Sequence, residues 1–410
     1  MQVRLAYGED GLDVSVPDDA VVVRAAQPPV LADEQGAVAD AVRPHLAGLV
    51  TGAPRVVVVF PDITRPMPNR TVLPPLLAEL EALGAGPDRV TLLCATGTHR
   101  VATAAELEAL IGPRLIERYP VVQHDCIESA HVEVGAVDGV PVRIDARYVG
   151  ADVKIVTGFV EPHFFAGFSG GPKGVCPGLA DMSTVLEAHS PARIADPGAT
   201  WTVLDGNPVH EFVRSAAALA PPDLSVDVAI DGERRLTAVF AGRLPDSHLA
   251  ACAHVQRTAV RTVPGRFDVV VSTNGGHPLD RNLYQAVKGM AAAERVVRPG
   301  GTIIMAASCV DGLPAGSPFA RLLERATTAE ELLRPGGPAT PEGWQTQVLG
   351  RVLAQARVEL FCDGISAEDV TRAQLVPVAD VSEAVARATG PGDRVCVLPL
   401  GPLTVATPGR

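Results

Sequence analysis

The chain has 410 residues, more than one ordinary hydrophobic core accommodates, so two or three domains are expected. Hydrophobic residues make up 47% and charged residues 20%, as in globular proteins, and the net charge of −12 argues against a general surface for nucleic acid or anionic membranes. No apolar stretch approaches the roughly 18 residues of a membrane span, and the N-terminus lacks the basic and apolar regions of a signal peptide, so neither is expected.

The first half of the chain alternates between expected strands and expected helices. A small β-rich start precedes a helix at 32–49. Further on, β-branched runs such as RVVVVF predict strands that are buried on both faces of a parallel sheet. We expect strands at 55–60, 89–95 and 152–160, and helices at 71–84 and 103–111.

A second series of the same kind begins near Gly265. We expect strands at 267–273, 301–308, 358–363 and 394–399, helices at 282–297, 317–333 and 342–357, and a turn at RPGG. Strands that alternate with helices predict right-handed crossovers and mostly parallel sheets. The fold class is therefore predicted as α/β, with two α/β domains, residues 1–262 and 263–410, meeting near 255–270 and facing each other across a cleft.

The number and spacing of the cysteines indicate whether an oxidising or a reducing compartment is expected for the protein. The seven cysteines are dispersed, and none forms a C-x-x-C pair. Neither a zinc knuckle nor a disulfide framework is predicted, and a reducing cytoplasm is the expected location.

Lysine is rare in this chain. Of the 35 basic residues only Lys154, Lys173 and Lys288 are lysine. Arginine cannot replace lysine where an amine must lose its proton and form a covalent bond, or act as a compact point charge. Lys173 and Lys288 lie in the segments SGGPKG and NLYQAVKG and are candidates for chemistry, while chance survival on a solvated face is the alternative for each.

Polar segments follow the expected strands, and the ligands of parallel sheets bind at the carboxyl ends of strands. His99 in ATGTH and His163 in EPHFF each come just after a strand. Imidazoles titrate near neutral pH, which suits acid–base work. The alternative for each is a loop histidine that is satisfied by backbone hydrogen bonds.

The segment FSGGPKG offers backbone N–H groups that can cradle a phosphate, although the Walker spacing is absent. Lys173 on this stiff turn suits a covalent tether, and an ordinary glycine-rich turn is the alternative. His189 in EAHSPAR has the ligand type for nickel, zinc, copper or iron. No second histidine accompanies it at ligand spacing, so a metal there would take its other ligands from a cofactor.

The segment PDITRP lies between a buried strand and a helix. Thr64 and Arg65 could hold phosphate or carboxylate, and Asp62 could hold ribose hydroxyls. A plain helix-entry turn is the alternative, since Asp, Thr and Pro all suit one.

The expected helix at 282–297 carries three polar groups on one face. Tyr284, Gln285 and Lys288 are three or four residues apart and offer a phenol, an amide and a cation. Together they suit a small hydroxy-carboxylate, while a solvated polar face is the alternative.

Taken together, PDITRP, ATGTH, EPHFFAGFSGGPKG, EAHSPAR and NLYQAVKG resemble the lactate racemase family, in order and over nearly the whole chain. The resemblance implies an isomerase: a racemase or epimerase that inverts C2 of a 2-hydroxy acid by reversible hydride transfer. It implies a nickel-pincer nucleotide, nickel(II) pyridinium-3,5-bisthiocarboxylic acid mononucleotide, tethered covalently at Lys173. The N-terminal domain would bind the cofactor, and the C-terminal domain would lie on the substrate side.

Carried over residue by residue, the resemblance implies His99 and His163 as the acid–base pair and His189 as the nickel ligand. It implies cofactor contacts from Asp62, Ile63, Thr64 and Arg65. It implies that Gln285 and Lys288 hold the substrate carboxylate, with Tyr284 as a weaker substrate contact.

The chemistry of the reaction agrees with this expectation. The C–H bond beside an ionised carboxylate is barely acidic, so removing a hydride is easier than removing a proton, and it gives a 2-keto acid. A reversible hydride acceptor is then needed, and two bases are needed because both isomers must be handled. Two histidines on separate loops meet that demand.

Two alternatives remain open at this point. Lys173 could form a Schiff base with a carbonyl substrate or pyridoxal phosphate, without nickel, or the chain could be a non-catalytic protein that binds a hydroxy acid or nucleotide. The expected partners are a small-molecule 2-hydroxy acid and, transiently, the cofactor-synthesis enzymes. No nucleic acid and no membrane is expected as a partner.

Overall fold

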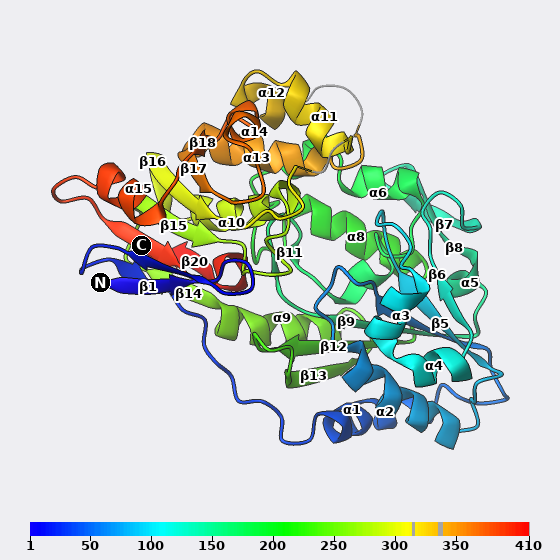
Figure 1. The fold of residues 1–410 in the computed structure, drawn as a ribbon. Coiled ribbons are helices and arrows are strands. Elements are labelled where there is room, and N and C mark those ends of the chain that lie inside the picture. Colours follow the sequence, from blue (N-terminus) through cyan, green and yellow to red (C-terminus); the bar gives the residue numbers. More distant parts are fainter. Residues whose placement is uncertain (314–315, 335–338, 410) are drawn as a thin grey trace. The chain divides into compact units, whose positions relative to one another are not determined.

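The computed structural model describes residues 1–313, 316–334 and 339–409 and comprises two compact units (Figure 1). Unit 1 contains Met1–Ala26, His189–Trp201 and Thr258–Arg410, and unit 2 contains Gln27–Ala188 and Thr202–Arg257. Both units are therefore discontinuous in the sequence. A division at 262/263 stays a prediction.

Unit 2 is built on a six-stranded sheet of order β13-β12-β9-β4-β5-β6. All neighbours are parallel except β13, which runs antiparallel to β12. The strands are β4 (Val56–Pro61), β5 (Val90–Ala95), β6 (Val121–Gln123), β9 (Val153–Phe159), β12 (Leu224–Ile230) and β13 (Leu236–Gly242).

The run VVVVF is buried on both faces of this sheet, as its composition predicts. Val56, Val58 and Phe60 of β4 pack into one hydrophobic cluster, and Val57 and Val59 pack into another. Such burial contributes about 1.5–3 kcal/mol for each large aliphatic side chain.

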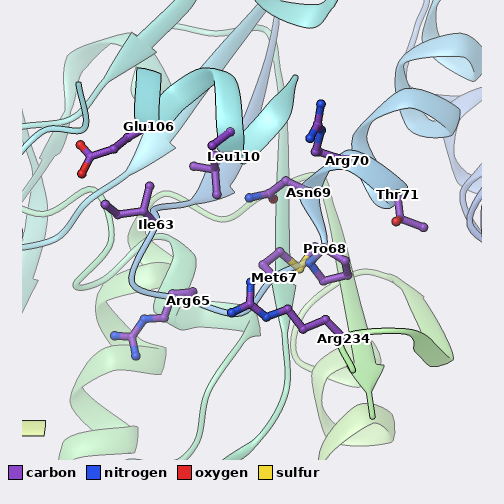
Figure 2. A pocket seen from close by; sticks show the side chains of 11 residues that line it. Ile63, Arg65, Met67, Pro68, Asn69, Arg70, Thr71, Glu106, Leu110 and Arg234 are labelled. Carbon is purple, nitrogen blue, oxygen red and sulfur yellow. The ribbon is translucent and has the colours of Figure 1, made fainter. Parts of the chain in front are cut away.

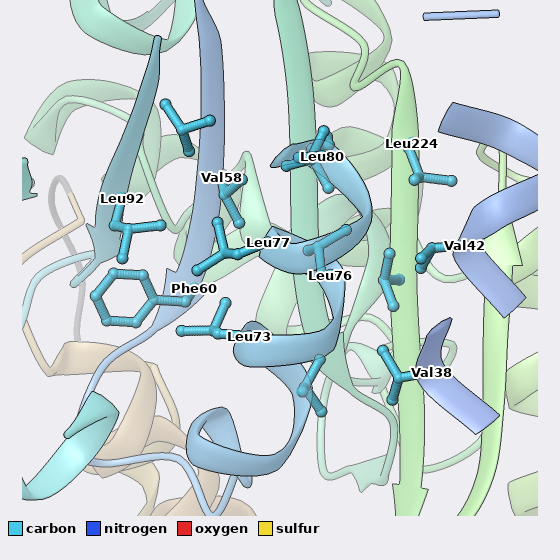
Figure 3. Close-up of a cluster of buried hydrophobic side chains, with 14 of the residues drawn as sticks. Val38, Val42, Val58, Phe60, Leu73, Leu76, Leu77, Leu80, Leu92 and Leu224 are labelled. Atoms are coloured by element: carbon cyan, nitrogen blue, oxygen red, sulfur yellow. The ribbon is translucent and has the colours of Figure 1, made fainter. Parts of the chain in front are cut away.

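Helices cover both faces of the sheet. On the first face are α1 (Glu34–Leu46), α2 (Asn69–Ala82), α3 (Ala104–Ile111) and α4 (Pro113–Arg118). Figure 3 shows Leu73 and Leu77 of α2 beside Val58 and Phe60. On the second face are α5 (Ala146–Val149), α6 (Met182–Ala188), α8 (Pro208–Leu219) and the hairpin of β7 (His131–Val137) and β8 (Val140–Asp145).

Unit 1 contains a six-stranded, fully parallel sheet of order β18-β17-β16-β15-β19-β3. Its strands are β3 (Val21–Val22), β15 (Phe267–Thr273), β16 (Val297–Ala306), β17 (Arg357–Phe361), β18 (Val376–Pro377) and β19 (Val395–Leu398). Smaller pairs are the hairpin of β1 (Gln2–Leu5) and β2 (Leu12–Ser15), and β14 (Val260–Val263) with β20 (Val405–Pro408).

The β1–β2 hairpin and α15 (Val381–Ala388) pack on one face of this sheet around a cluster of valines. On β15 and β16, helices α10 (Leu283–Glu294) and α13 (Gly343–Gln355) also pack. The remaining helices of unit 1 are α7 (Pro191–Ala195), α11 (Pro318–Arg325), α12 (Ala329–Leu333) and α14 (Ala367–Arg372).

The predicted α/β class with mostly parallel sheets is confirmed, but two local predictions were wrong. The expected helix at 317–333 is broken into α11 and α12, because the Thr328 side chain accepts a hydrogen bond from the Glu331 N–H and starts a new helix. The expected turn at RPGG lies inside β16 as an irregularity, with Gly300 at φ +74° and a register shift opposite β15. None of the helices in the described ranges is both long and apolar enough to cross a membrane.

Candidate active site

The order in which strands are added to the sheet of unit 2 reverses at β4. From β4 the chain continues outward through β5 and β6 on one side, and it later returns to place β9, β12 and β13 on the other. Ligands of such sheets bind beyond the carboxyl ends of the strands at this switch point. The segments PDITRP, ATGTH and EPHFF follow β4, β5 and β9, which are adjacent and parallel, so their strand ends lie within about 10 Å of one another.

Asp62 and His99 form a hydrogen-bonded pair at this edge. The His99 Nδ1 lies 2.8 Å from Asp62 Oδ2, and Thr64 Oγ1 donates to Asp62 Oδ1 at 2.7 Å. Burial alone would raise the pKa of the Asp62 carboxyl, but the hydrogen bond and charge of His99 and the charge of Arg65 bring that pKa below its ordinary value. A carboxylate only accepts, so Nδ1 carries the proton and Nε2 is the basic nitrogen of the neutral ring.

His163 is held in the opposite tautomer. It ends the two-residue strand β10 (Pro162–His163), which pairs with β11 (Gly167–Phe168), and it is buried at 7% exposure. Its Nδ1 accepts hydrogen bonds from the backbone N–H groups of Ala166 at 3.3 Å and Phe165 at 3.5 Å. A backbone N–H only donates, so the neutral ring carries its proton on Nε2.

Lys173 lies in a one-turn 3-10 helix, η1 (Gly171–Gly174), directly after β11 and the Ser169-Gly170 corner. The Lys173 N–H donates to the Gly170 carbonyl at 3.1 Å. The Lys173 Nζ lies 5.7 Å from the centroid of the Phe165 ring, within cation–π range. The same phenylalanine ring makes an edge contact with the His163 imidazole at 4.5 Å, so Phe165 contacts both functional candidates.

The loops that carry His99 and Lys173 are tied to each other. The Gly97 N–H donates to the Gly178 carbonyl at 3.0 Å. Behind this contact, Thr96 Oγ1 donates to the His124 carbonyl at 2.7 Å, and the His124 Nε2 lies 3.1 Å from the Ala180 carbonyl. The two loops of unit 2 are therefore connected through backbone carbonyls as well as through the sheet.

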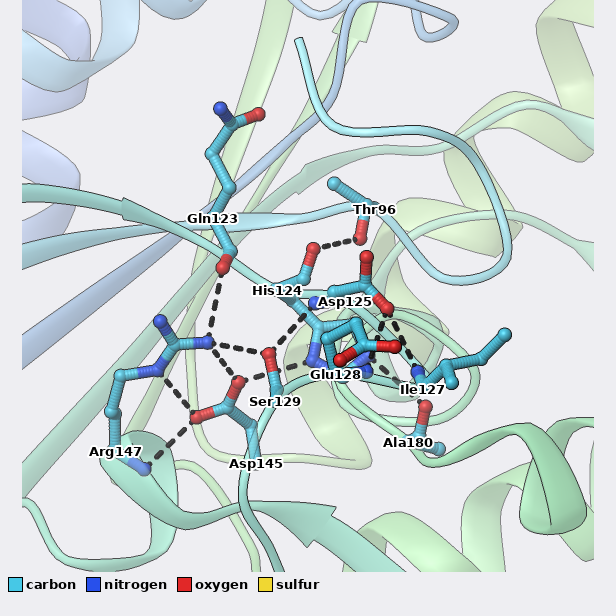
Figure 4. Close-up of polar contacts among 10 residues, drawn as sticks. All are labelled: Thr96, Gln123, His124, Asp125, Ile127, Glu128, Ser129, Asp145, Arg147 and Ala180. Carbon is cyan, nitrogen blue, oxygen red and sulfur yellow. Dashed lines mark hydrogen bonds and ion pairs between the residues drawn. The ribbon is translucent and has the colours of Figure 1, made fainter.

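The His124 imidazole belongs to a buried polar network that Figure 4 shows. Its Nδ1 lies 3.1 Å from Asp145 Oδ2, and both side chains are fully buried. Arg147 donates to Asp145 through Nε at 2.9 Å. Burial alone would raise the pKa of Asp145, but the hydrogen bonds of Arg147 and His124 hold that pKa well below its ordinary value. We interpret this network as structural support for the two loops.

In unit 1, the helix α10 carries the predicted carboxylate-binding residues. Asn282 caps the helix by accepting from the Gln285 N–H at 3.0 Å. One turn further on, Lys288 Nζ donates to Gln285 Oε1 at 2.7 Å. The ammonium and the amide therefore lie side by side in the first turns of α10, as their spacing predicts.

His189 and Tyr284 share Trp344 as a neighbour in unit 1. The His189 ring lies 4.7 Å from the Trp344 ring, centroid to centroid, and Trp344 Nε1 donates to the Tyr284 hydroxyl at 3.2 Å. Gln345 also donates to the Tyr284 carbonyl. Neither Trp344 nor Gln345 was selected from the sequence, although a tryptophan at the start of a helix in a chain with two tryptophans was an available signal.

A cavity of about 380 Å³ lies beside the PDITRP segment in unit 2 (Figure 2). Its volume is at the lower end of the range of small-molecule sites. Ile63 and Arg65 line it, and two further arginines give it a basic character. The lining residues are Ile63, Arg65, Met67, Pro68, Asn69, Arg70, Thr71, Glu106, Ala109, Leu110 and Arg234.

A metal held by protein side chains alone would need several donor groups close together. In the part of the chain that the structure describes, no group of three or more His, Cys, Asp or Glu side chains could hold a metal ion. Among the predicted site residues, His189 supplies one imidazole, next to the Trp344 ring.

Family comparisons cover nearly the whole chain. The lactate racemase N-terminal domain family matches residues 7–202, and the lactate racemase C-terminal domain family matches residues 263–403. The lactate racemase of Thermoanaerobacterium thermosaccharolyticum is 34% identical over 400 residues, covering 93% of this chain and 93% of the relative. The lactate racemase of Lactiplantibacillus plantarum is 34% identical over 368 residues, covering 87% of this chain and 86% of the relative.

Solved structures agree with the sequence relatives. The lactate racemase apoprotein of T. thermosaccharolyticum superposes with a TM-score of 0.92 at 32% identity, covering 99% of this chain and 100% of that chain. A Thermotoga maritima protein has the same fold, with a TM-score of 0.72 at 18% identity over 94% of this chain and 100% of that chain. The chain belongs to the lactate racemase family and is an isomerase of the racemase type.

Proposed function

We propose that this racemase inverts C2 of a 2-hydroxy acid with a nickel-pincer nucleotide tethered at Lys173 and ligated by His189. The observation that carries the proposal is the Asp62–His99 pair, which lies at the same sheet edge as His163 and the turn of Lys173. An oriented imidazole at a topological switch point is the feature that acid–base work on a bound ligand needs.

The residues of unit 2 fit such a nucleotide. Lys173 lies in a turn with its Nζ 5.7 Å from the centroid of the Phe165 ring, and the PDITRP segment supplies hydroxyl, carboxyl and guanidinium groups. When bound, the nucleotide supplies a reversible acceptor for the hydride that leaves C2. In our proposal Asp62, Ile63, Thr64 and Arg65 lie along it.

The substrate would be oriented through its carboxylate. Lys288 provides a compact positive charge, and Gln285 fixes that charge through its amide oxygen. A charge-assisted contact of this type contributes about 1.5–3 kcal/mol to binding. Tyr284 would be a weaker contact from the same helix.

The proton steps follow from the two tautomers. For one isomer, the basic Nε2 of His99 takes the hydroxyl proton while C2 becomes the carbonyl carbon of a 2-keto acid. His163 would return a proton from Nε2 to the carbonyl oxygen when the hydride comes back to the opposite face; this step needs the imidazolium form of His163, in which Nδ1 no longer accepts from the backbone N–H groups. For the mirror isomer the two imidazoles exchange these roles, starting from the other protonation states.

The proposal is tested by loading and by turnover. The chain is co-expressed with the cofactor-synthesis enzymes, its intact mass and nickel content are measured, and a panel of D- and L-2-hydroxy acids is assayed for inversion. Lys173→Arg should lose the covalent adduct, while Lys154→Arg, the matched control on β9, should keep it. The proposal would be overturned if the wild-type protein carried no covalent adduct after co-expression, or if it inverted none of the acids in the panel.

Two further outcomes separate the alternatives. Borohydride trapping of a carbonyl compound on Lys173 without nickel would favour a Schiff-base enzyme. Ligand affinity that survives His189→Ala, with no turnover of any acid, would favour a binding protein.

Location and partners complete the proposal. We propose a reducing compartment, the cytoplasm, and transient encounters with the cofactor-synthesis enzymes. All seven cysteines are thiols, and six of them are buried, which suits such a compartment.

A further inference from the structure

A buried polar cluster lies directly behind the turn that carries Lys173. Asp227 projects from β12, His248 and Cys252 from α9 (Asp246–Ala259), and His210 from α8. All four side chains are buried, and Asp227 has no exposed surface. Nothing in the sequence singled out these residues, because none lies in a segment with a recognisable motif.

Asp227 holds the turn by its backbone. Its Oδ1 accepts a hydrogen bond from the Gly171 N–H at 2.8 Å, and its Oδ2 accepts from Ser225 Oγ at 2.9 Å. A β carbon at Gly170 would lie 2.6 Å from the same Oδ1, and Gly170 has φ +78°. The two glycines therefore allow the carboxyl group to approach the turn more closely than any other residue would permit.

His248 holds Ser169, two residues before Gly171. Its Nε2 lies 2.9 Å from the Ser169 carbonyl, which only accepts, so Nε2 donates. The Cys252 Sγ lies 3.4 Å from the same nitrogen. A β carbon at Gly171 would lie 2.4 Å from the His248 ring. The imidazole therefore fixes the Ser169 carbonyl, and the carboxyl group fixes the Gly171 N–H, on either side of Gly170.

The cluster is more polar than an ordinary turn requires. Burying polar groups costs free energy unless each is hydrogen-bonded, and a neutral side chain or a backbone carbonyl could accept from Gly171 at a lower cost. His210, whose ring stacks 6.1 Å from that of His248, stays neutral, since burial and then the charges of His248, Arg214 and Lys173 lower its pKa to about 4. Two groups of the cluster, the Asp227 carboxyl and the His248 imidazole, bond directly to the backbone of the segment Ser169–Gly171.

We propose that Asp227, supported by His248, is a positioning residue for Lys173: it anchors Gly171 and so fixes where the lysine amine stands. This inference rests on the proposed function in assigning the tether to Lys173. Lys173 comes two residues after Gly171, whose N–H is held by Asp227. The Lys173 N–H is itself hydrogen-bonded to the Gly170 carbonyl, so a displacement of Gly171 also moves the Lys173 amine.

The chain offers a matched control. Asp223 immediately precedes β12, and its Oδ2 accepts from the backbone N–H of Lys154 at 2.8 Å, the same kind of bond at the same length. Asp223→Ala therefore removes an equivalent carboxyl-to-backbone bond away from the turn. Asp227→Asn is the conservative variant, because its amide oxygen can still accept from Gly171, and the Ser225 hydroxyl can rotate to accept from the amide nitrogen.

Two readouts are measured on each folded variant. The first needs no cofactor: trace acetylation followed by peptide mapping gives the labelling rate of Lys173 relative to Lys288, since the chain has only three lysines. The second is the fraction of chain that carries the covalent adduct after co-expression with the cofactor-synthesis enzymes, from intact mass.

We expect Asp227→Ala to raise the relative labelling of Lys173 and to lower the adduct fraction, each by about 10-fold, as for residues that orient a ligand-bearing group. Asp227→Asn and Asp223→Ala should both stay near wild type. If Asp227→Ala does not fold by circular dichroism, Gly170→Ala disturbs the same contact from the loop side and should give the same changes.

Three results would overturn the inference: no change in Asp227→Ala or Gly170→Ala, equal changes in Asp223→Ala, or no rescue by Asp227→Asn. If wild-type protein acquires no adduct, the proposed tether fails, but the labelling rates still decide whether Asp227 positions Lys173.

Discussion

The candidate residues of the two units are held in different ways. In unit 2, His99 and His163 are each fixed by a partner that decides which ring nitrogen carries the proton, a carboxylate for one and backbone N–H groups for the other. In unit 1, Lys288 and Gln285 are fixed to each other on the first turns of a capped helix. Unit 2 therefore provides groups suited to proton transfer, and unit 1 provides a charge suited to binding, so substitutions should separate into effects on kcat and effects on KM.

The largest effects are expected from the two histidines. His99→Ala and His163→Ala should each lower kcat by at least about 10², because each would remove one of the two proposed proton-transfer groups. For enantiomeric substrates, which have equal free energies, kcat/KM must fall by the same factor in both directions. Steady-state assays from each pure isomer check this, with the exposed His45→Ala as a control. A loss confined to KM would contradict the assignment.

Asp62→Asn sharpens the comparison within unit 2. An amide nitrogen facing His99 Nδ1 would donate, which would move the ring proton to Nε2 and give His99 the same tautomer as His163. We expect kcat to fall by about 10- to 100-fold, with KM nearly unchanged, as when a residue that orients a histidine is replaced. The tautomer can be read from the ¹⁵N chemical shifts of the His99 ring. Unchanged shifts with a reduced kcat would contradict this explanation.

Gln285→Leu tests the binding side of the comparison in unit 1. Leucine keeps the size of the side chain but removes the oxygen that fixes Lys288 Nζ. KM should rise by about 10-fold, which corresponds to about 1.4 kcal/mol of lost carboxylate binding, and kcat should change little. Glu79→Gln, in the exposed ion pair of Arg43 on α1, is a control that should leave both constants unchanged. An equal fall of kcat and kcat/KM would mean that Gln285 acts in the transition state instead.

Local patterns predicted most of the strands and helices that carry these residues. The run 267–273 became β15 with the predicted bounds, and 103–111 became α3 with Thr103 as its cap. Partners that come from distant parts of the chain were not predictable in this way. β3 pairs with β19 across more than 370 residues, although the strand itself is only Val21–Val22. The strands β12 and β13 were also missed; in β12, LSVDVAI places an aspartate among apolar residues.

The same distinction holds for the site. Residues such as Lys173 and His99 lie in segments whose composition is unusual by itself, so the sequence singles them out. Asp227 and Asp145 are ordinary residues in ordinary strands, and only the folded arrangement brings them to Gly171 and His124. Their partners are fixed by tertiary structure, about which hydrophobic periodicity carries no information.

Trp344 is the missed residue whose replacement should have the smallest effect. Trp344→Phe keeps an aromatic ring against His189 but removes the Nε1–H that donates to the Tyr284 hydroxyl. The free energy of unfolding should fall by about 1 kcal/mol, the net value of one such hydrogen bond, and KM should rise only a few-fold because Tyr284 loses one restraint. Urea denaturation measures the first effect and steady-state kinetics the second. Tyr284→Phe removes the other partner of the bond, so the double variant should be no less stable than the weaker of the two single variants. A fully additive loss would mean that Trp344 stabilises unit 1 by packing alone, and that the tyrosine on α10 is oriented by its own helix.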